Sequence, residues 1–136
     1  MKDTNEFGFE VEGPVESGEF VFEEIHEGEG RSLTFFPPLR VVWDTYVDHH
    51  PAGDTTTAYI EMDFGMEYKI KPVATKNGGW HYDEINKDST NEEVIKTIIK
   101  FDLFHAFCHT SLDPNYGIIH WALYGNLKDR VIIKDD

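Results

Sequence analysis

The sequence predicts an α+β fold: a curved, mainly antiparallel sheet of about seven to eight strands packed on one long helix (residues 91–109), followed by a C-terminal β-hairpin. Two observations carry this prediction. Apolar residues alternate with polar ones through Ala58–Ile70, and a helix-capping pattern at Thr90 precedes apolar residues with helical spacing. At 136 residues, the chain is expected to form a single acidic domain, residues 1–136.

The first third of the chain is expected to contain four short strands, separated by proline and glycine. Gly13-Pro14 and Ser17-Gly18 are typical of a turn, and Pro37-Pro38 is expected to end a strand because proline cannot donate to a ladder. The predicted strands are Phe7–Gly13, Glu19–Ile25, Arg31–Phe36 and Leu39–Val47.

The clearest strand is Ala58–Ile70, in which every even position is apolar or aromatic, with Gly65 as an expected bulge. Asn77-Gly78 suits a type I′ turn, after which the chain is expected to return as a partner strand. The remaining predicted strands are Gly79–Tyr82 and, across the C-terminal hairpin, Ile118–Tyr124 and Arg130–Lys134.

The predicted helix carries a candidate polar site. Asp102, His105 and His109 continue the helical stripe begun by the isoleucines, so all three are expected to face the interior. Buried polar groups need partners. A hydrogen-bonded core network is the favoured interpretation, and a pocket in which the three residues act as catalytic acids and bases is the alternative.

A metal site is a further alternative, although no cofactor is expected. Histidines four residues apart share one helical face and can bind one ion, so His105 and His109 could hold zinc or another transition metal. His120, or the pair His49-His50, could supply a third ligand. The HxxxH pattern lacks the glutamate of a zinc-protease motif, and no phosphate-binding loop or nucleophile elbow is present.

The charge distribution points to a different function. The net charge is −14, and residues 1–30 contain ten Asp and Glu but only one lysine. Such a field repels phosphates and anionic lipids, so neither direct nucleic-acid binding nor membrane binding is expected. It attracts basic proteins such as nucleases, toxins or nucleic-acid-binding enzymes. In charge and size alone, the chain resembles bacterial immunity proteins and phage anti-defence proteins that imitate DNA.

We therefore expect a small acidic binding protein that inhibits a partner by masking its basic surface. The alternatives are an enzyme or ligand-binding protein that uses the helix pocket, and a structural or virion assembly component. Glutamates on alternate strand positions lie about 6.8 Å apart, a spacing that can face a row of cations. The expected partner-binding residues are Glu6, Glu10, Glu12, Glu19, Glu23, Glu24, Glu61 and Asp63.

The expected compartment is a reducing cytoplasm, in a bacterial or phage-infected cell. The chain has one cysteine, Cys108, so it cannot form an internal disulfide. Its first residues, MKDTNEFGFEVEG, have neither the basic nor the apolar region of a signal peptide.

Overall fold

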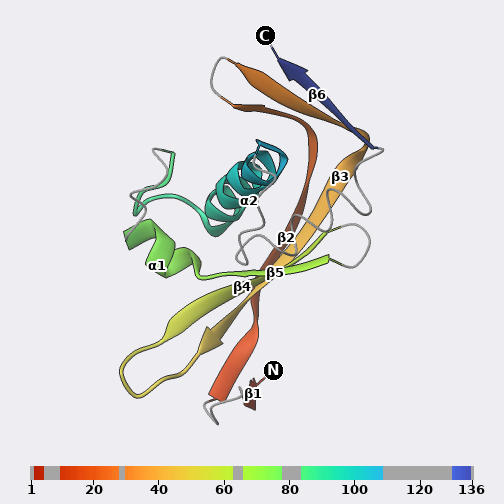
Figure 1. Cartoon of the computed structure of the whole chain (residues 1–136). Coiled ribbons are helices and arrows are strands. Elements are labelled where there is room, and N and C mark those ends of the chain that lie inside the picture. Colours follow the sequence, from red (N-terminus) through yellow and green to blue (C-terminus); the bar gives the residue numbers. More distant parts are fainter. Residues whose placement is uncertain are drawn as a thin grey trace. The chain divides into compact units, whose positions relative to one another are not determined.

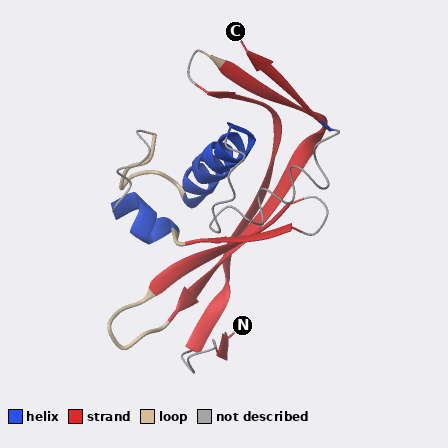
Figure 2. Cartoon of the chain, in the orientation of Figure 1, coloured by secondary structure: helices blue, strands red, loops and turns tan. Residues whose placement is uncertain are grey.

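The computed structural model describes residues 2–4, 10–27, 30–62, 66–77, 84–108 and 130–135. Figures 1 and 2 show their six strands and two helices. The strands are β1 (Lys2–Thr4), β2 (Glu10–Glu27), β3 (Arg31–Asp48), β4 (Thr55–Met62), β5 (Met66–Ile70) and β6 (Val131–Asp135), and the helices are α1 (Pro72–Asn77) and α2 (Asn91–Cys108).

The sheet is open and antiparallel, and strands β2, β3, β4 and β5 are neighbours in it in chain order. The short strand β1 extends it beside β2, with Asp3 opposite Val11. The last strand, β6, pairs with the first residues of β3, where Leu33 lies opposite Ile133.

The predicted fold class is therefore wrong in its details, although a mainly-sheet fold is partly consistent with it. Among the described residues the sheet has fewer than seven strands, and there are two helices instead of one. The sequence pattern overestimates the number of strands because β2 and β3 continue through the prolines and glycines that predict strand ends. The C-terminal hairpin is also not observed, because the predicted strand Ile118–Tyr124 lies outside the described residues and β6 pairs with β3.

A turn was predicted at Gly13-Pro14 and a strand end at Pro37-Pro38, but the strands continue through both, and side chains bond the backbone near these prolines. β2 continues from Glu10 to Glu27 without a turn after Pro14. The N–H of Glu16 donates to Oγ1 of Thr45 (3.1 Å), and this hydroxyl donates in return to the Glu16 carbonyl (3.4 Å). A buried hydroxyl thus supplies bonds to the backbone two residues beyond the proline.

β3 likewise continues through Pro37-Pro38 as one strand of 18 residues, which joins the two strands expected on either side. The guanidinium of Arg130 donates from Nη2 to the carbonyl oxygens of Pro37 (2.6 Å) and Pro38 (3.1 Å). Prolines are tolerated in a strand where no ladder N–H is required. Arg130 is distant in sequence, so this compensation could not be foreseen locally.

The Ala58–Ile70 segment forms β4 and β5, and residues 63–65, which include the predicted bulge, lie outside the described part of the chain. The alternation predicted that the even positions share one apolar face, and this is confirmed for Ala58, Ile60, Met62 and Ile70, which are buried. The chain then forms α1 instead of the predicted turn at Asn77. Proline at the first helical position and glycine directly after the helix are a helix signature that the turn interpretation missed. The predicted strand Gly79–Tyr82 lies outside the described residues.

Helix α2 begins at Asn91, directly after the predicted cap. The hydroxyl of Thr90 accepts a hydrogen bond from the N–H of Glu93 (3.1 Å), which satisfies one of the unpaired donors of the first turn. The buried side chains of the helix are Val94, Ile95, Ile98, Ile99, Asp102, Leu103 and Phe104.

The chain forms two compact units, and a single domain stays a prediction. The first unit contains residues 1–18, 42–60 and 68–97. Its buried residues include Trp43, whose indole N–H donates to Glu92 (3.3 Å). The indole lies so close to Gly18 that a Cβ there would be 2.7 Å from it.

The second unit contains residues 19–41, 61–67 and 98–136. Its largest fully buried side chains are Ile25, Leu33, Phe35, Leu39, Val41, Ile99 and Leu103. The rings of Phe20 and Phe22 meet edge to face at 5.3 Å between centroids. The buried apolar residues of β2 and β3 in this unit are Phe22, Ile25, Leu33, Phe35, Leu39 and Val41.

Candidate functional site

Most of the expected partner-binding glutamates are exposed on β2. Glu10, Glu19, Glu23 and Glu24 of this strand are exposed, Glu12 is half-buried, and Glu61 of β4 is exposed. Glu6 and Asp63 lie outside the described residues. On the same strand Phe22 and Ile25 are buried, whereas Val15 and Val21 are exposed, so only some of the apolar side chains of β2 face inward.

Some carboxylates of this surface lie next to basic side chains of the protein itself. In the second unit the Arg40 guanidinium lies 2.6 Å from a carboxylate oxygen of Glu19, and both side chains are more than half exposed. Glu24 lies 3.4 Å from the ring of His26. Exposed ion pairs of this kind contribute about 0–1 kcal/mol to stability, so a partner's cation can replace them at little cost.

Apolar side chains are also exposed in the second unit. In the second unit Val21 is 49% exposed on β2, Phe36 is 60% exposed on β3, and Ile132 is 46% exposed on β6. In β2, Val21 lies between Glu19 and Glu23, two residues from each, and residues at this spacing face the same side of a strand. The surface of the second unit therefore combines carboxylates with apolar contact area.

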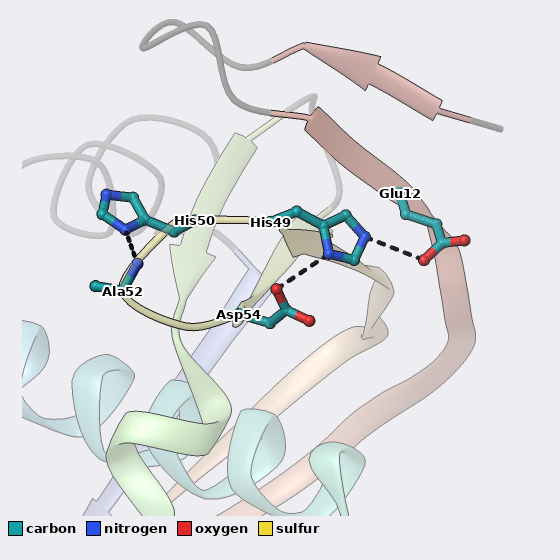
Figure 3. Close-up of polar contacts among 5 residues, drawn as sticks. All are labelled: Glu12, His49, His50, Ala52 and Asp54. Atoms are coloured by element: carbon teal, nitrogen blue, oxygen red, sulfur yellow. Dashed lines mark hydrogen bonds and ion pairs between the residues drawn. The ribbon is translucent and has the colours of Figure 1, made fainter.

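A second polar cluster lies in the first unit, around His49 in the connection between β3 and β4 (Figure 3). Its Nδ1 is 3.0 Å from Oδ1 of Asp54, and its Nε2 is 3.3 Å from Oε2 of Glu12 on β2. The backbone N–H of His49 also donates to the carbonyl of Glu10 (2.8 Å). One residue thus bonds to β2 through both its backbone and its ring.

The hydrogen bonds to Asp54 and then Glu12 raise the pKa of His49 above 6.5, since they outweigh the opposing effect of burial. Both ring nitrogens face carboxylate oxygens, which are acceptors only, so both contacts are hydrogen bonds when the ring carries two protons. Protonation of His49 is therefore favoured by the two acids that flank its ring.

The neighbouring histidine has a different role. Nδ1 of His50 accepts a hydrogen bond from the backbone N–H of Ala52 (3.1 Å), and the N–H of Gly53 donates to the His50 carbonyl (2.9 Å). His50 therefore shapes the turn, while His49 joins the turn to β2. The two rings point in different directions (Figure 3).

The first unit also carries a row of aromatic residues. The rings of Tyr46 on β3 and Tyr59 on β4 meet edge to face, with 5.3 Å between their centroids. Nζ of Lys69 on β5 lies 5.3 Å from the centroid of Tyr59. Burial and then Asp44 raise the pKa of Tyr46, so this phenol keeps its proton at neutral pH.

The polar residues of α2 are described only in part. Asp102 is buried, with 5% of its surface exposed, as the helical stripe predicted. The backbone of His105 lies in α2, but its side chain, together with His109 and His120, lies outside the described residues. Within the described part of the chain, no three His, Cys, Asp or Glu residues are arranged to hold a metal ion.

Sequence reasoning did not find the His49 cluster or the tyrosine row. Glu12 is distant in sequence from His49, and Tyr46, Tyr59 and Lys69 lie on three different strands, so the pairing of β2, β3, β4 and β5 brings these residues together. The one available signal was the His49-His50 pair before a Pro-Ala-Gly turn, followed by Asp54.

In comparisons with known proteins, no family model, no curated protein and no solved structure matches the chain. A function is therefore inferred from these sites alone. Neither helix of the described residues is long and apolar enough to cross a membrane.

Proposed function

We propose that this protein is a small acidic binding protein that masks a basic surface of a partner protein, in the manner of immunity or anti-defence proteins, in the cytoplasm of a bacterial or phage-infected cell. One observation carries the proposal. In the second unit, exposed Val21 lies on β2 between the exposed carboxylates of Glu19 and Glu23. A surface that serves solubility alone requires the charges but not the exposed apolar side chain.

The composition of this surface indicates the chemistry of the partner. Protein interfaces combine an apolar centre with a polar rim, and complementary charge accelerates association. Val21, with Phe36 and Ile132 of the same unit, supplies apolar area, and Glu23 and Glu24 supply the negative charge. The fitting partner is a protein that presents lysines or arginines around an apolar patch.

Capture with the immobilised protein tests the proposal. Partners retained at low ionic strength and released at high ionic strength would be identified and purified, and their Kd measured by calorimetry. We expect Glu23→Gln and Val21→Ser each to weaken binding. Glu93→Gln is the matched control, because it removes the same charge from an exposed position on α2.

Two results would count against the proposal. Binding that does not change with ionic strength would exclude an electrostatic partner. Equal weakening by Glu93→Gln and Glu23→Gln would mean that only the overall charge matters, which is the behaviour of a solubility surface.

A further inference from the structure

The tyrosine row of the first unit lies on a sheet face that is open to solvent. Tyr59 is 41% exposed, whereas its neighbours Ala58 and Ile60 are buried. Adjacent residues of a strand face opposite sides, so Tyr59 points away from the side that carries the buried residues. Lys69 is exposed as well, and Tyr46 is half-buried. Two large rings thus stand on the solvent side of β3 and β4.

The position of Tyr46 is determined by the backbone beneath it. A Cβ at Gly13 would lie 2.6 Å from Cδ1 of Tyr46 and 3.0 Å from the Thr45 carbonyl oxygen, so no side chain fits there. Gly13 also has φ of 155°, in the region that favours glycine. The ring therefore rests against β2, with Tyr59 in contact at 5.3 Å. Such a prearranged ring loses little entropy when a partner binds.

The face of Tyr59 already attracts a positive charge. Lys69 Nζ lies 5.3 Å from the ring centroid, within the range of a cation–π contact. This lysine has a flexible chain and a strongly hydrated ammonium, so its contact is readily exchanged. The planar guanidinium of an arginine on a partner protein can stack on an aromatic ring, whereas the ammonium of lysine cannot.

We propose that Tyr46, Tyr59 and Asp44 form a docking surface for an arginine-bearing segment of a basic partner protein, and that Lys69 covers Tyr59 in the unbound state. The inference deepens the proposed function and rests on it. The net charge of −14 supplies the attraction, and the two rings supply stacking area. Asp44 lies two residues before Tyr46 on β3, hence on the same side of the strand, and its carboxylate supplies an acceptor for the guanidinium. Tyrosine is also among the residues that dominate binding energy at interfaces.

A fluorescein-labelled decaarginine peptide is the probe, and its Kd is measured by fluorescence anisotropy at fixed ionic strength. We expect Tyr59→Leu to weaken binding about two- to fivefold, the value of one exposed cation–π contact. Tyr59→Phe should bind within about twofold of wild type, because phenylalanine retains the aromatic face.

Two lysines of the same unit provide a matched pair. Lys69→Met and Lys71→Met remove the same charge from exposed positions two residues apart, but only Lys69 contacts the tyrosine ring. If Lys69 competes with the incoming arginine, Lys69→Met strengthens decaarginine binding more than Lys71→Met does. Equal effects of the two variants would overturn the role of Lys69.

An NMR titration of the wild-type protein makes the test independent of how the variants fold. The Tyr46 and Tyr59 ring signals should shift with decaarginine and remain unchanged with decaproline at equal concentration. Equal shifts with both peptides would show that the rings do not distinguish arginine from a neutral extended peptide, which overturns the proposal.

The failures of the two proposals are distinguishable. Unchanged affinity in Tyr59→Leu, together with weaker binding in Glu23→Gln, would overturn the docking surface and leave the acidic binding function standing. Absence of any decaarginine binding at low ionic strength would overturn both.

Discussion

Nδ1 of His49 lies 3.0 Å from Oδ1 of Asp54, while Nε2 of the same ring lies 3.3 Å from Oε2 of Glu12. Imidazole donates from both nitrogens only in its protonated form. Within the first unit, the His49 ring therefore connects β2 to the turn that precedes β4, and both contacts are hydrogen bonds when the ring is protonated. Because Glu12 was expected to contact a partner, this bond also assigns it a role inside the protein.

The first prediction concerns the titration of His49. Its pKa should be higher than 6.5, because protonation is stabilised by hydrogen bonds to Asp54 and Glu12. An NMR titration of the ring signals measures it, and Asp54→Asn should lower the midpoint more than Glu12→Gln, since Asp54 has the larger effect. A wild-type midpoint at or below 6.5 would contradict the protonated bridge.

The second prediction concerns stability as a function of pH. A histidine whose pKa is raised by folding stabilises the native state fully at pH below its unfolded value of about 6.5. That contribution is lost as the pH rises through the higher folded value. The difference in unfolding free energy between wild type and His49→Gln, from urea denaturation, should therefore decrease from pH 6 towards higher pH. A difference that does not change with pH would rule out the linkage.

The third prediction concerns the close approach of Gly18 to Trp43. A Cβ at Gly18 would lie 2.7–2.9 Å from three atoms of the indole, so the buried ring would have to move. Gly18→Ala should lower the unfolding free energy by about 1–3 kcal/mol, the usual cost of overpacking. Gly30→Ala is the control, because a Cβ there meets nothing within 4 Å. Thermal or urea denaturation should show a loss in the first variant only.

The fourth prediction concerns the hydroxyl of Thr45, which is 1% exposed and bonds both the N–H and the carbonyl of Glu16. Thr45→Val keeps the branched shape but leaves these backbone groups without the hydroxyl. The expected loss is about 1–3 kcal/mol of unfolding free energy. Thr55→Val, at an exposed position of β4, should change stability by less than about 0.5 kcal/mol. Equal losses would contradict a specific role of the Thr45 hydroxyl.

The fifth prediction concerns the cap of α2. Thr90→Ala removes the acceptor for the N–H of Glu93 and should cost about 1 kcal/mol. Thr90→Ser retains a hydroxyl at the same place and should restore most of that stability. Equal losses of unfolding free energy in the two variants would mean that the Thr90 hydroxyl does not stabilise the helix.

Local patterns predicted several elements well. The cap at Thr90 and the facing of Ala58–Met62 depend on residues close together in the chain, and the structure has both. The burial of Asp102 also follows from helical periodicity alone. These features were predictable because the interactions that produce them are local.

The turn predictions failed where distant residues compensate for a local signal. Pro14 and Pro37 each indicate the end of a strand, yet β2 and β3 continue through them. Thr45 and Arg130, at separations of 29 and 93 residues from the groups they bond, satisfy the backbone there. Helix α1 was missed for a different reason, because Asn77-Gly78 was assigned to a hairpin.

By itself, the sequence determined the negative charge of −14, the inward face of β4 and the start of α2, since composition, alternation and capping depend on single residues or near neighbours. Only the tertiary structure decided that β6 pairs with β3, that His49 bridges Glu12 and Asp54, and that Tyr46 meets Tyr59. These contacts depend on which strands pair and in which register, and register results from the packing of the whole sheet.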